Sequence, residues 1–180
     1  MIRRILVPLD GSASAEGVLP HVARLGKALE ARVDLVHAIA EGRDSRRLGV
    51  EDPVAYRFLH ADRAWYLEGQ AAELRRNGLE VGTSVEAGEA ASVIVGLVRQ
   101  HSYDLVAMAP RGSGGAAGWM GCTAIAVALN ARSSVLLVPG GKPPEYGRQR
   151  ERTDTVMVAV DCSARSDWIV SVAAAIARGT

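Results

Sequence analysis

Two segments of the chain repeat one pattern, and this repeat limits the possible folds more than any other feature of the sequence. Residues 5–16 and residues 156–167 each contain a run of aliphatic residues, an aspartate and a turn with a serine, before an apolar-periodic helix. The correspondence continues without a gap, since Val18 matches Ile169. A repeat at a fixed offset indicates a structural unit that recurs. The unit here is the first strand and helix of an α/β domain.

The repeat divides the chain into three parts. We expect one complete domain over residues 1–139 and the first strand and helix of a truncated second copy over residues 155–180. Residues 140–154 contain Gly-Gly, Pro-Pro and a run of charges, a composition typical of a linker. One strand and one helix cannot bury their own apolar faces. We therefore expect the last part to be ordered and to dock on the sheet of its own chain or of a partner chain.

Apolar runs of strand length alternate with helical patterns along the first part. The continuous run over residues 5–9 is typical of a strand buried on both faces of a parallel sheet. The run over residues 79–85 alternates more, which indicates a strand nearer an edge. Strands that alternate with helices predict a parallel sheet with helices on both faces. The expected strands cover residues 5–9, 33–39, 79–85, 105–108 and 135–138.

Turn and capping residues predict where the helices begin and end. Ser12 or Ser14 can cap the first helix, whose apolar stripe includes Val18. Asp52-Pro53 is a helix start, and Asn77-Gly78 ends that long helix. Aromatic residues on the long helix are expected to pack in the core or to cover the site. A further helix over residues 89–101 and a short apolar one ending near residue 130 complete the prediction.

Composition excludes several classes of function. The chain has 180 residues, 48% of them hydrophobic, and a net charge of +1, as in an ordinary soluble domain. This balance gives no reason to expect binding to nucleic acid or to a membrane, and no apolar run is long enough to cross one. Its two cysteines, Cys122 and Cys162, form no disulfide framework. A cytoplasmic location is the expectation, and Cys122 is expected to be a small buried residue.

Two features have the chemistry of a binding site. Asp10 ends the first strand, where its carboxylate could accept hydrogen bonds from a ribose hydroxyl or an adenine amino group, or could only cap its turn. The second feature is the glycine-rich stretch over residues 111–121, whose backbone amides and following helix N-terminus suit an anion. The hydroxyl of Thr123 could also reach a phosphate. Alternatively, the stretch is only a flexible loop, and it lacks the lysine of the P-loop motif.

Taken together, the order and spacing of these segments resemble the universal stress protein family. The residues that carry the resemblance are Val7-Pro8-Leu9-Asp10-Gly11-Ser12, the strand ending at His37, Val85-Glu86-Ala87-Gly88, Asp104-Leu105-Val106-Ala107-Met108, and the glycine-rich stretch leading to Ser134-Val135-Leu136-Leu137-Val138-Pro139. The resemblance implies an adenine nucleotide alpha hydrolase-like fold, with a five-stranded parallel sheet in the order 3-2-1-4-5.

The ATP-binding branch of that family has a loop of the form G-x2-G-x9-G-[ST]. Here Ala109 takes the place of the first glycine, and the interval from Gly112 to Gly121 is one residue short. Cys122 stands where the serine or threonine belongs. By resemblance, the nucleotide-binding residues are Pro8, Asp10, Gly11, Ser12, His37, Met108, Ala109, Arg111, Gly112, Gly115, Gly121, Cys122 and Thr123.

The resemblance implies a nucleotide-binding or sensing protein of the stress response without dedicated catalysis. ATP is the expected ligand, with Mg²⁺ only when ATP is bound, and neither a catalytic residue nor a resident metal is expected. The expected partner is a second copy, joined through the fifth strand at Val135 to Val138. The alternatives are a nucleotide-free dimerisation or interaction module, and a slow ATP hydrolase.

Overall fold

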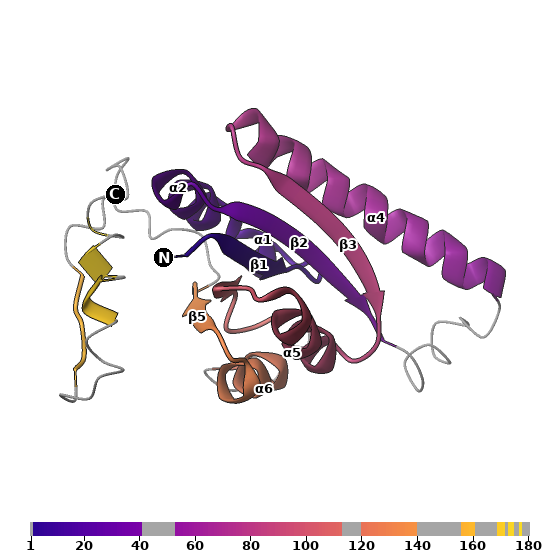
Figure 1. The fold of residues 1–180 in the computed structure, drawn as a ribbon. Helices are drawn as coiled ribbons and strands as arrows, with labels where there is room; N and C mark the ends of the chain where they lie inside the picture. The colour runs from indigo at the N-terminus through magenta and orange to yellow at the C-terminus, as the bar shows by residue number, and fades with distance from the viewer. Residues whose placement is uncertain are drawn as a thin grey trace.

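A computed structural model describes residues 2–40, 53–112, 120–139 and 156–160, together with residues 169–171, 173, 174 and 177. Five parallel strands form one sheet in the order β3-β2-β1-β4-β5 (Figure 1). The predicted fold class and strand order are therefore confirmed. The strands are β1 (Arg4–Pro8), β2 (Arg32–Ile39), β3 (Val81–Ala87), β4 (Leu105–Met108) and β5 (Ser134–Leu137).

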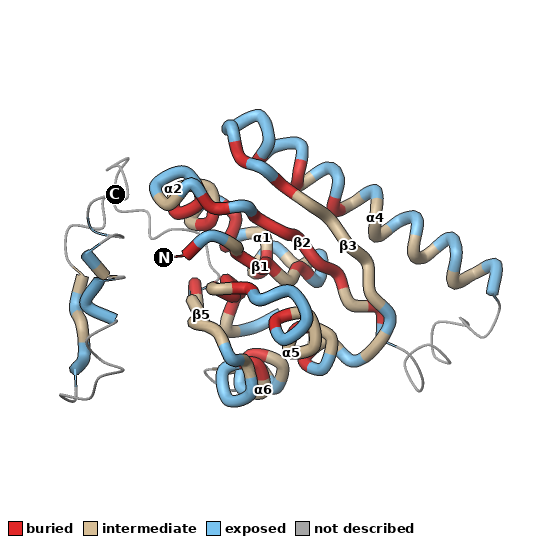
Figure 2. The backbone as a smooth tube through the Cα atoms, in the orientation of Figure 1, coloured by how far each residue is buried: buried red, intermediate tan, exposed pale blue. Residues whose placement is uncertain are grey.

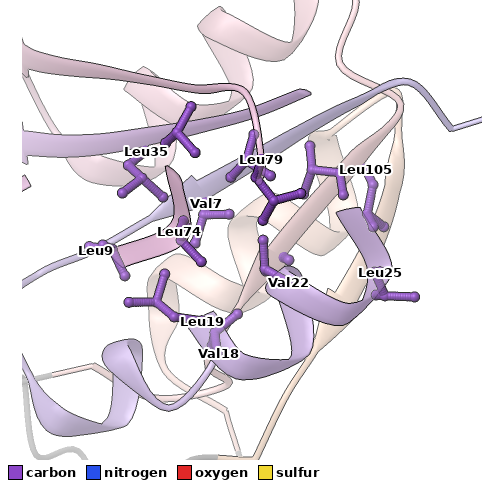
Figure 3. Close-up of a cluster of buried hydrophobic side chains, with 14 of the residues drawn as sticks. Val7, Leu9, Val18, Leu19, Val22, Leu25, Leu35, Leu74, Leu79 and Leu105 are labelled. Carbon is purple, nitrogen blue, oxygen red and sulfur yellow. The ribbon is translucent and has the colours of Figure 1, made fainter. Parts of the chain in front are cut away.

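Helices cover both faces of this sheet and enclose two clusters of buried side chains. One face packs against α1 (Ala13–Glu16), α2 (Leu19–Leu29) and α4 (Pro53–Arg76). Figure 3 shows the centre of that cluster, where leucine and valine side chains of the sheet meet those of α2 and α4. The opposite face packs against α5 (Ala90–His101) and α6 (Cys122–Asn130). The apolar runs form strands because both of their faces are buried in this way.

The position of each strand follows its pattern of burial. The interior residues of β1 and all four residues of β4 are buried, as the continuous apolar runs predict. Most of β3 is only half-buried, and β3 lies at one edge of the sheet. The expected edge position of the alternating run is thus confirmed, with the strand two residues later than predicted.

Most helix boundaries agree with the capping signals. Ser12 caps α1, and its Oγ accepts a hydrogen bond of 3.2 Å from the amide of Ala15. The expected first helix is divided in two, because α1 ends at the C-cap Gly17 and α2 starts at Leu19. Gly78, which follows α4, has φ +86°. This left-handed conformation is one that glycine adopts without strain.

Helix α4 is buried along one side only, and only in its C-terminal half. Its buried residues are Leu67, Ala71 and Leu74. Phe58 and Trp65 lie on the opposite side and are 73% and 81% exposed. The expectation that these aromatic residues pack in the core is wrong for both, as the exposed outer side of α4 in Figure 2 makes visible. Tyr66 does pack against the core.

A buried carboxylate joins the amino ends of three strands. Asp34 of β2 accepts a hydrogen bond of 2.9 Å from the hydroxyl of Tyr103, just before β4. It also accepts bonds of 3.2 Å from Arg4 and 3.0 Å from Arg32. The Arg4 guanidinium lies 4.6 Å from the centre of the Tyr103 ring, a cation–π contact. Gly82 of β3 leaves room for the Asp34 carboxylate, which a Cβ at that position would overlap.

The C-terminal part is described in short pieces. Residues 156–160 are not in a strand, and no strand of the described sheet pairs with them. Met157 and Val160 are 92% and 56% exposed. The expected strand therefore does not extend the sheet of its own chain within the described residues. The predicted linker, residues 140–154, lies wholly outside them. None of the described helices is long and apolar enough to cross a membrane.

Candidate functional site

The sheet opens at the carboxyl end of β1. Strands β1 and β4 are paired at Ile5 with Leu105 and at Leu6 with Val106, and no further. The pairing of β1 with β2 continues to Pro8 and Val36, and the amide of Leu9 still donates to the Val36 carbonyl at 2.9 Å. The chain after β1 therefore separates from the chain after β4. This is the switch point of the strand order, where open parallel sheets bind their ligands.

A cavity of about 400 Å³ lies at this point. Its walls come from the ends of β1, β2 and β4, the segments that follow β1 and β4, and the facing parts of α1, α5 and α6. The lining residues are Pro8, Leu9, Asp10, Ala15, Val36, Ala38, Ala90, Ile94, Met108, Ala109, Pro110, Arg111, Gly112, Gly121, Cys122, Thr123 and Ala124. Most of these are apolar, and none of the described lining residues is aromatic.

The turn after β1 holds the Asp10 carboxylate in place. Its Oδ1 accepts hydrogen bonds from the amide of Ser12 at 3.0 Å and from the Ser12 hydroxyl at 2.6 Å. Gly11 makes this turn possible because its φ is +81°, a value that costs glycine little. Ser12 thus caps α1 and orients Asp10 at the same time. The Asp10 side chain lines the cavity although the residue is exposed.

The segment after β4 approaches Asp10 closely. A Cβ added at Gly112 would overlap the Oδ2 atom of Asp10. Only a residue without a side chain can bring its backbone so near to this carboxylate. Gly112 therefore sets the distance between the two edges of the cavity. This structural role is independent of any ligand.

Helix α6 begins at the cavity with an uncapped N-terminus. Its N-cap is Gly121, which offers no side-chain hydrogen bond, and its first turn contains no acidic residue. The amide of Gly121 donates to the Pro110 carbonyl at 2.8 Å, which fixes the start of the helix beside the segment after β4. Unpaired amides and the helix dipole make such an end attractive to an anion. Thr123 adds a hydroxyl on the same side of the cavity.

The charged residues of the described lining are Asp10 and Arg111. Arg111 directly follows Pro110 and lies at the same end of the cavity as Gly121. Cys122 is exposed, so the expectation of a buried cysteine is wrong. As the first residue of α6, Cys122 stands on the open side of the helix, while Ala124 and Val127 are buried against the sheet.

Most of the residues predicted from the sequence meet in this one place. Those that line the cavity are Pro8, Asp10, Met108, Ala109, Arg111, Gly112, Gly121, Cys122 and Thr123. Gly11 and Ser12 are not among the lining residues and shape the turn that carries Asp10. Gly115 lies outside the described residues. His37 is described but does not line the cavity.

His37 lies on the other face of the sheet because side chains alternate along a strand. Its neighbours Val36 and Ala38 line the cavity, so His37 points away from it. Burial lowers the pKa of His37, and the charge of Arg63 on α4 adds to this effect. Its Nδ1 atom is buried without a hydrogen-bond partner in the described part of the chain.

The aliphatic wall of the cavity was missed in the sequence. The sequence predicts only a buried strand that contains Val36 and Ala38 and a helix with Ile94 on its inward side. Aliphatic residues of this kind carry no polar group that would indicate a binding site. The alternation of side chains along β2 does contain a signal for this wall. Residues 36 and 38 share a face with each other and not with residue 37.

The comparison with protein families agrees with this fold. The sequence profile described as the universal stress protein family matches residues 1–139. This chain belongs to the universal stress protein family. The match covers the whole of the sheet and its helices, and it ends two residues after β5. A comparison with curated protein sequences gave no significant match.

Several solved structures of other proteins have the same fold. One is the hypothetical protein MJ0577, whose biochemical function is described as assigned from its structure. It is 25% identical to this chain and superposes with a TM-score of 0.71. The match covers 79% of this chain and 99% of that one. A universal stress protein in complex with cAMP is 18% identical, with a TM-score of 0.59 over 77% and 97% of the two chains. A family member from Arabidopsis thaliana with AMP bound is 13% identical, with a TM-score of 0.56 over 79% and 97%.

Proposed function

We propose that this universal stress protein binds an adenine nucleotide in the cavity and acts as a nucleotide-dependent sensor. The observation that carries the proposal is the polarity of the cavity. Part of its described lining is aliphatic, and another part combines Arg111 with the uncapped N-terminus of α6. A nucleotide has the same division into a flat base with little charge and an anionic phosphate. Related structures with AMP and cAMP bound support this choice of ligand.

In this proposal the base rests on the aliphatic wall. Val36, Ile94 and Met108 are nearly or fully buried and line the cavity. Because they already expose little surface to water, a planar base would gain mainly packing contacts with them. The Asp10 carboxylate, which lies close to Gly112, can accept hydrogen bonds from a ribose hydroxyl or from the adenine amino group.

We place the phosphate beside Arg111 and the start of α6. Arg111 offers a planar, permanently charged group that binds phosphate oxygens well. The amides at the start of α6 and the Thr123 hydroxyl add donors. We propose that AMP, cAMP and ATP can all be accepted, with Mg²⁺ bound only together with ATP, since the described lining offers Asp10 as its sole carboxylate.

Calorimetric titration with adenosine, AMP, cAMP and ATP tests the proposal. Arg111→Ala is expected to lower the affinity for AMP about tenfold, the value of one charge-assisted contact, and to leave the affinity for adenosine unchanged. Asp10→Ala should weaken both ligands. Arg99→Ala, an exposed arginine in the last turn of α5, is the matched control. Binding of AMP that neither site variant changes would remove this cavity as the site.

We propose further that the bound nucleotide is not turned over rapidly. A hydrolase needs a base positioned near the attacking water or nucleophile, and Asp10 is already bonded to the turn residue Ser12. Release of phosphate from ATP at about one per second or faster, staying with the protein through purification, would refute this part. The alternative of a slow hydrolase predicts a much lower rate that Asp10→Ala abolishes.

We also propose a homodimer through β5, the fifth strand. Strand β5 is at the other edge of the described sheet and is only half-buried. An apolar edge strand tends to pair with another chain unless it is covered. Val135→Lys should therefore reduce dimer formation in sedimentation velocity measurements. A wild-type protein that stays monomeric would contradict the proposal.

A further inference from the structure

The outward side of α4 carries a continuous apolar stripe. Its residues are three or four positions apart, the spacing that keeps side chains on one side of a helix, and every one of them is exposed. They are opposite the buried Leu67, Ala71 and Leu74. The α4 stripe consists of Val54, Phe58, Ala61, Trp65, Gly69 and Ala72.

The α4 stripe exposes more apolar surface than a monomer needs to. Val54, Phe58 and Trp65 are 55%, 73% and 81% exposed. Since an aromatic side chain offers about 150–250 Å², the two aromatic residues alone leave about 300 Å² in solvent. The whole stripe presents about 400 Å², a size that in monomeric proteins often marks a binding surface.

Large and small side chains alternate along the stripe in an order that lets two antiparallel copies of α4 interlock. From the N-terminal end the order is large, large, small, large, small, small. Read backwards, every large residue falls opposite a small one, as interlocking packing requires. In an antiparallel pair of α4 helices, the facing residues are Trp65 with Ala61, Phe58 with Gly69, and Val54 with Ala72. Nothing lies within 4 Å of a Cβ built at Gly69, so a second copy can approach there.

Charged residues beside the stripe fit the same arrangement. Arg57 and Glu68 lie on the same flank of the helix, eleven positions apart. The antiparallel register given above brings Arg57 of one copy opposite Glu68 of the other, and the two-fold axis repeats this pair. Glu68 also pairs with Arg75 at 2.7 Å within its own chain. A basic surface for membranes or nucleic acids would lack this alternation of sign.

We infer that the α4 stripe is a self-association surface, in which α4 of a second copy packs antiparallel across a two-fold axis. Pairing two stripes covers about 800 Å² directly and about 1,000 Å² with the flanks, near the lower limit for a specific interface. The pair should therefore form and dissociate in the micromolar range. This surface is separate from β5, so a chain that uses both would form assemblies larger than a dimer.

Sedimentation velocity over about 1–100 μM, a range that spans micromolar association, tests the inference. Trp65→Glu is expected to reduce the average mass at the highest concentration to about half that of the wild type, because one interface is lost. Leu129→Glu on α6, which is 79% exposed, is the matched control and should leave the mass unchanged. Both variants retain β5, so the difference between them reports on α4.

A second pair of variants tests the facing of large and small residues. Ala61→Trp opposes two tryptophans and should weaken association, whereas Ala61→Trp combined with Trp65→Ala exchanges the two positions and should restore it. Both positions are on the solvent side of α4, and equal melting temperatures check that the fold is intact. The inference is overturned if Trp65→Glu and wild type have the same mass at every concentration, or if the double variant associates no better than Ala61→Trp.

Discussion

Removing the Tyr103 hydroxyl should cost the domain about 2 kcal/mol of unfolding free energy. Its oxygen donates 2.9 Å to Asp34, whose side chain is only 12% exposed. A hydrogen bond to a charged group contributes about 1.5–3 kcal/mol net. The arginine partners of Asp34 are 37% and 44% exposed, so solvent screens them to about 1 kcal/mol or less each. Tyr103, which is 8% exposed, is therefore the partner of this carboxylate that solvent screens least.

A double-mutant cycle measures this bond directly. Tyr103→Phe, Asp34→Ala and the double variant are compared with wild type by urea denaturation at pH 7. In the absence of Asp34, the hydroxyl has lost its acceptor, so Tyr103→Phe should then cost little. The expected coupling is about 1.5–2 kcal/mol. Tyr56→Phe, on the partly exposed side of α4, is the control and should change stability by no more than about 0.5 kcal/mol.

The coupling should depend on pH in a defined direction. Burial alone would raise the pKa of Asp34, but the hydrogen bonds from Arg32, Tyr103 and Arg4 outweigh it and lower that pKa. The stabilisation is then complete above the unfolded pKa of about 4 and is lost as the pH falls through the lower folded value. Burial and the bond to Asp34 raise the pKa of Tyr103 to about 12, so its hydroxyl remains a donor throughout. A coupling below about 0.5 kcal/mol at pH 7, or one that grows on acidification, would refute the reasoning.

Three further perturbations test other parts of the domain. Gly112→Ala should weaken AMP binding about tenfold in calorimetry, because its methyl group would overlap Asp10 Oδ2. The control Gly96→Ala places its methyl group in open space and should leave the affinity unchanged. Equal affinities of the two variants would contradict this prediction. Glu89→Ala should lower stability by about 1 kcal/mol, since the Glu89 carboxylate caps α5 by accepting hydrogen bonds from two backbone amides. These bonds lower the pKa of Glu89. The melting temperatures of variant and wild type should therefore converge as the pH falls below about 4. Ile94→Ala should cost about 2–5 kcal/mol in urea denaturation, since Ile94 is 1% exposed; a cost below 1 kcal/mol would mean that the cavity wall collapses without strain.

The fold could be predicted because the sequence marks each of its elements locally. Continuous apolar runs identified β1 and β4, and Asp52-Pro53 and Asn77-Gly78 bracketed α4. The bounds of some elements differ from the predicted ones, because contacts with the rest of the fold set them. Strand β5 is Ser134–Leu137 and not Val135–Val138, since its register with β4 sets the ends. The two helices α1 and α2 were expected as one, because nothing in the apolar stripe reveals the break at Gly17.

The candidate site was predictable in its backbone and less so in its side chains. Asp10 and Gly112 could be identified because a carboxylate and a glycine-rich stretch that each follow a strand are local signals. The face on which His37 lies follows from the alternation of side chains along β2, and its resemblance-based assignment to the site does not take this alternation into account. The exposure of Cys122 depends on which side of α6 meets the sheet. The bond between Asp34 and Tyr103 joins residues far apart in sequence, which no local pattern can reveal.

The uneven burial of α4 has a consequence for its dynamics. All its buried residues lie between Leu67 and Leu74, so no described residue in the turns near Pro53 is buried. Segments with few buried contacts open locally at a free-energy cost well below that of global unfolding. Amide hydrogens in the first turns of α4 should thus exchange with solvent faster than those in its last turns. Pairing through the α4 stripe would slow that exchange, because Val54 and Phe58 would then be covered, and the rate would rise again on dilution.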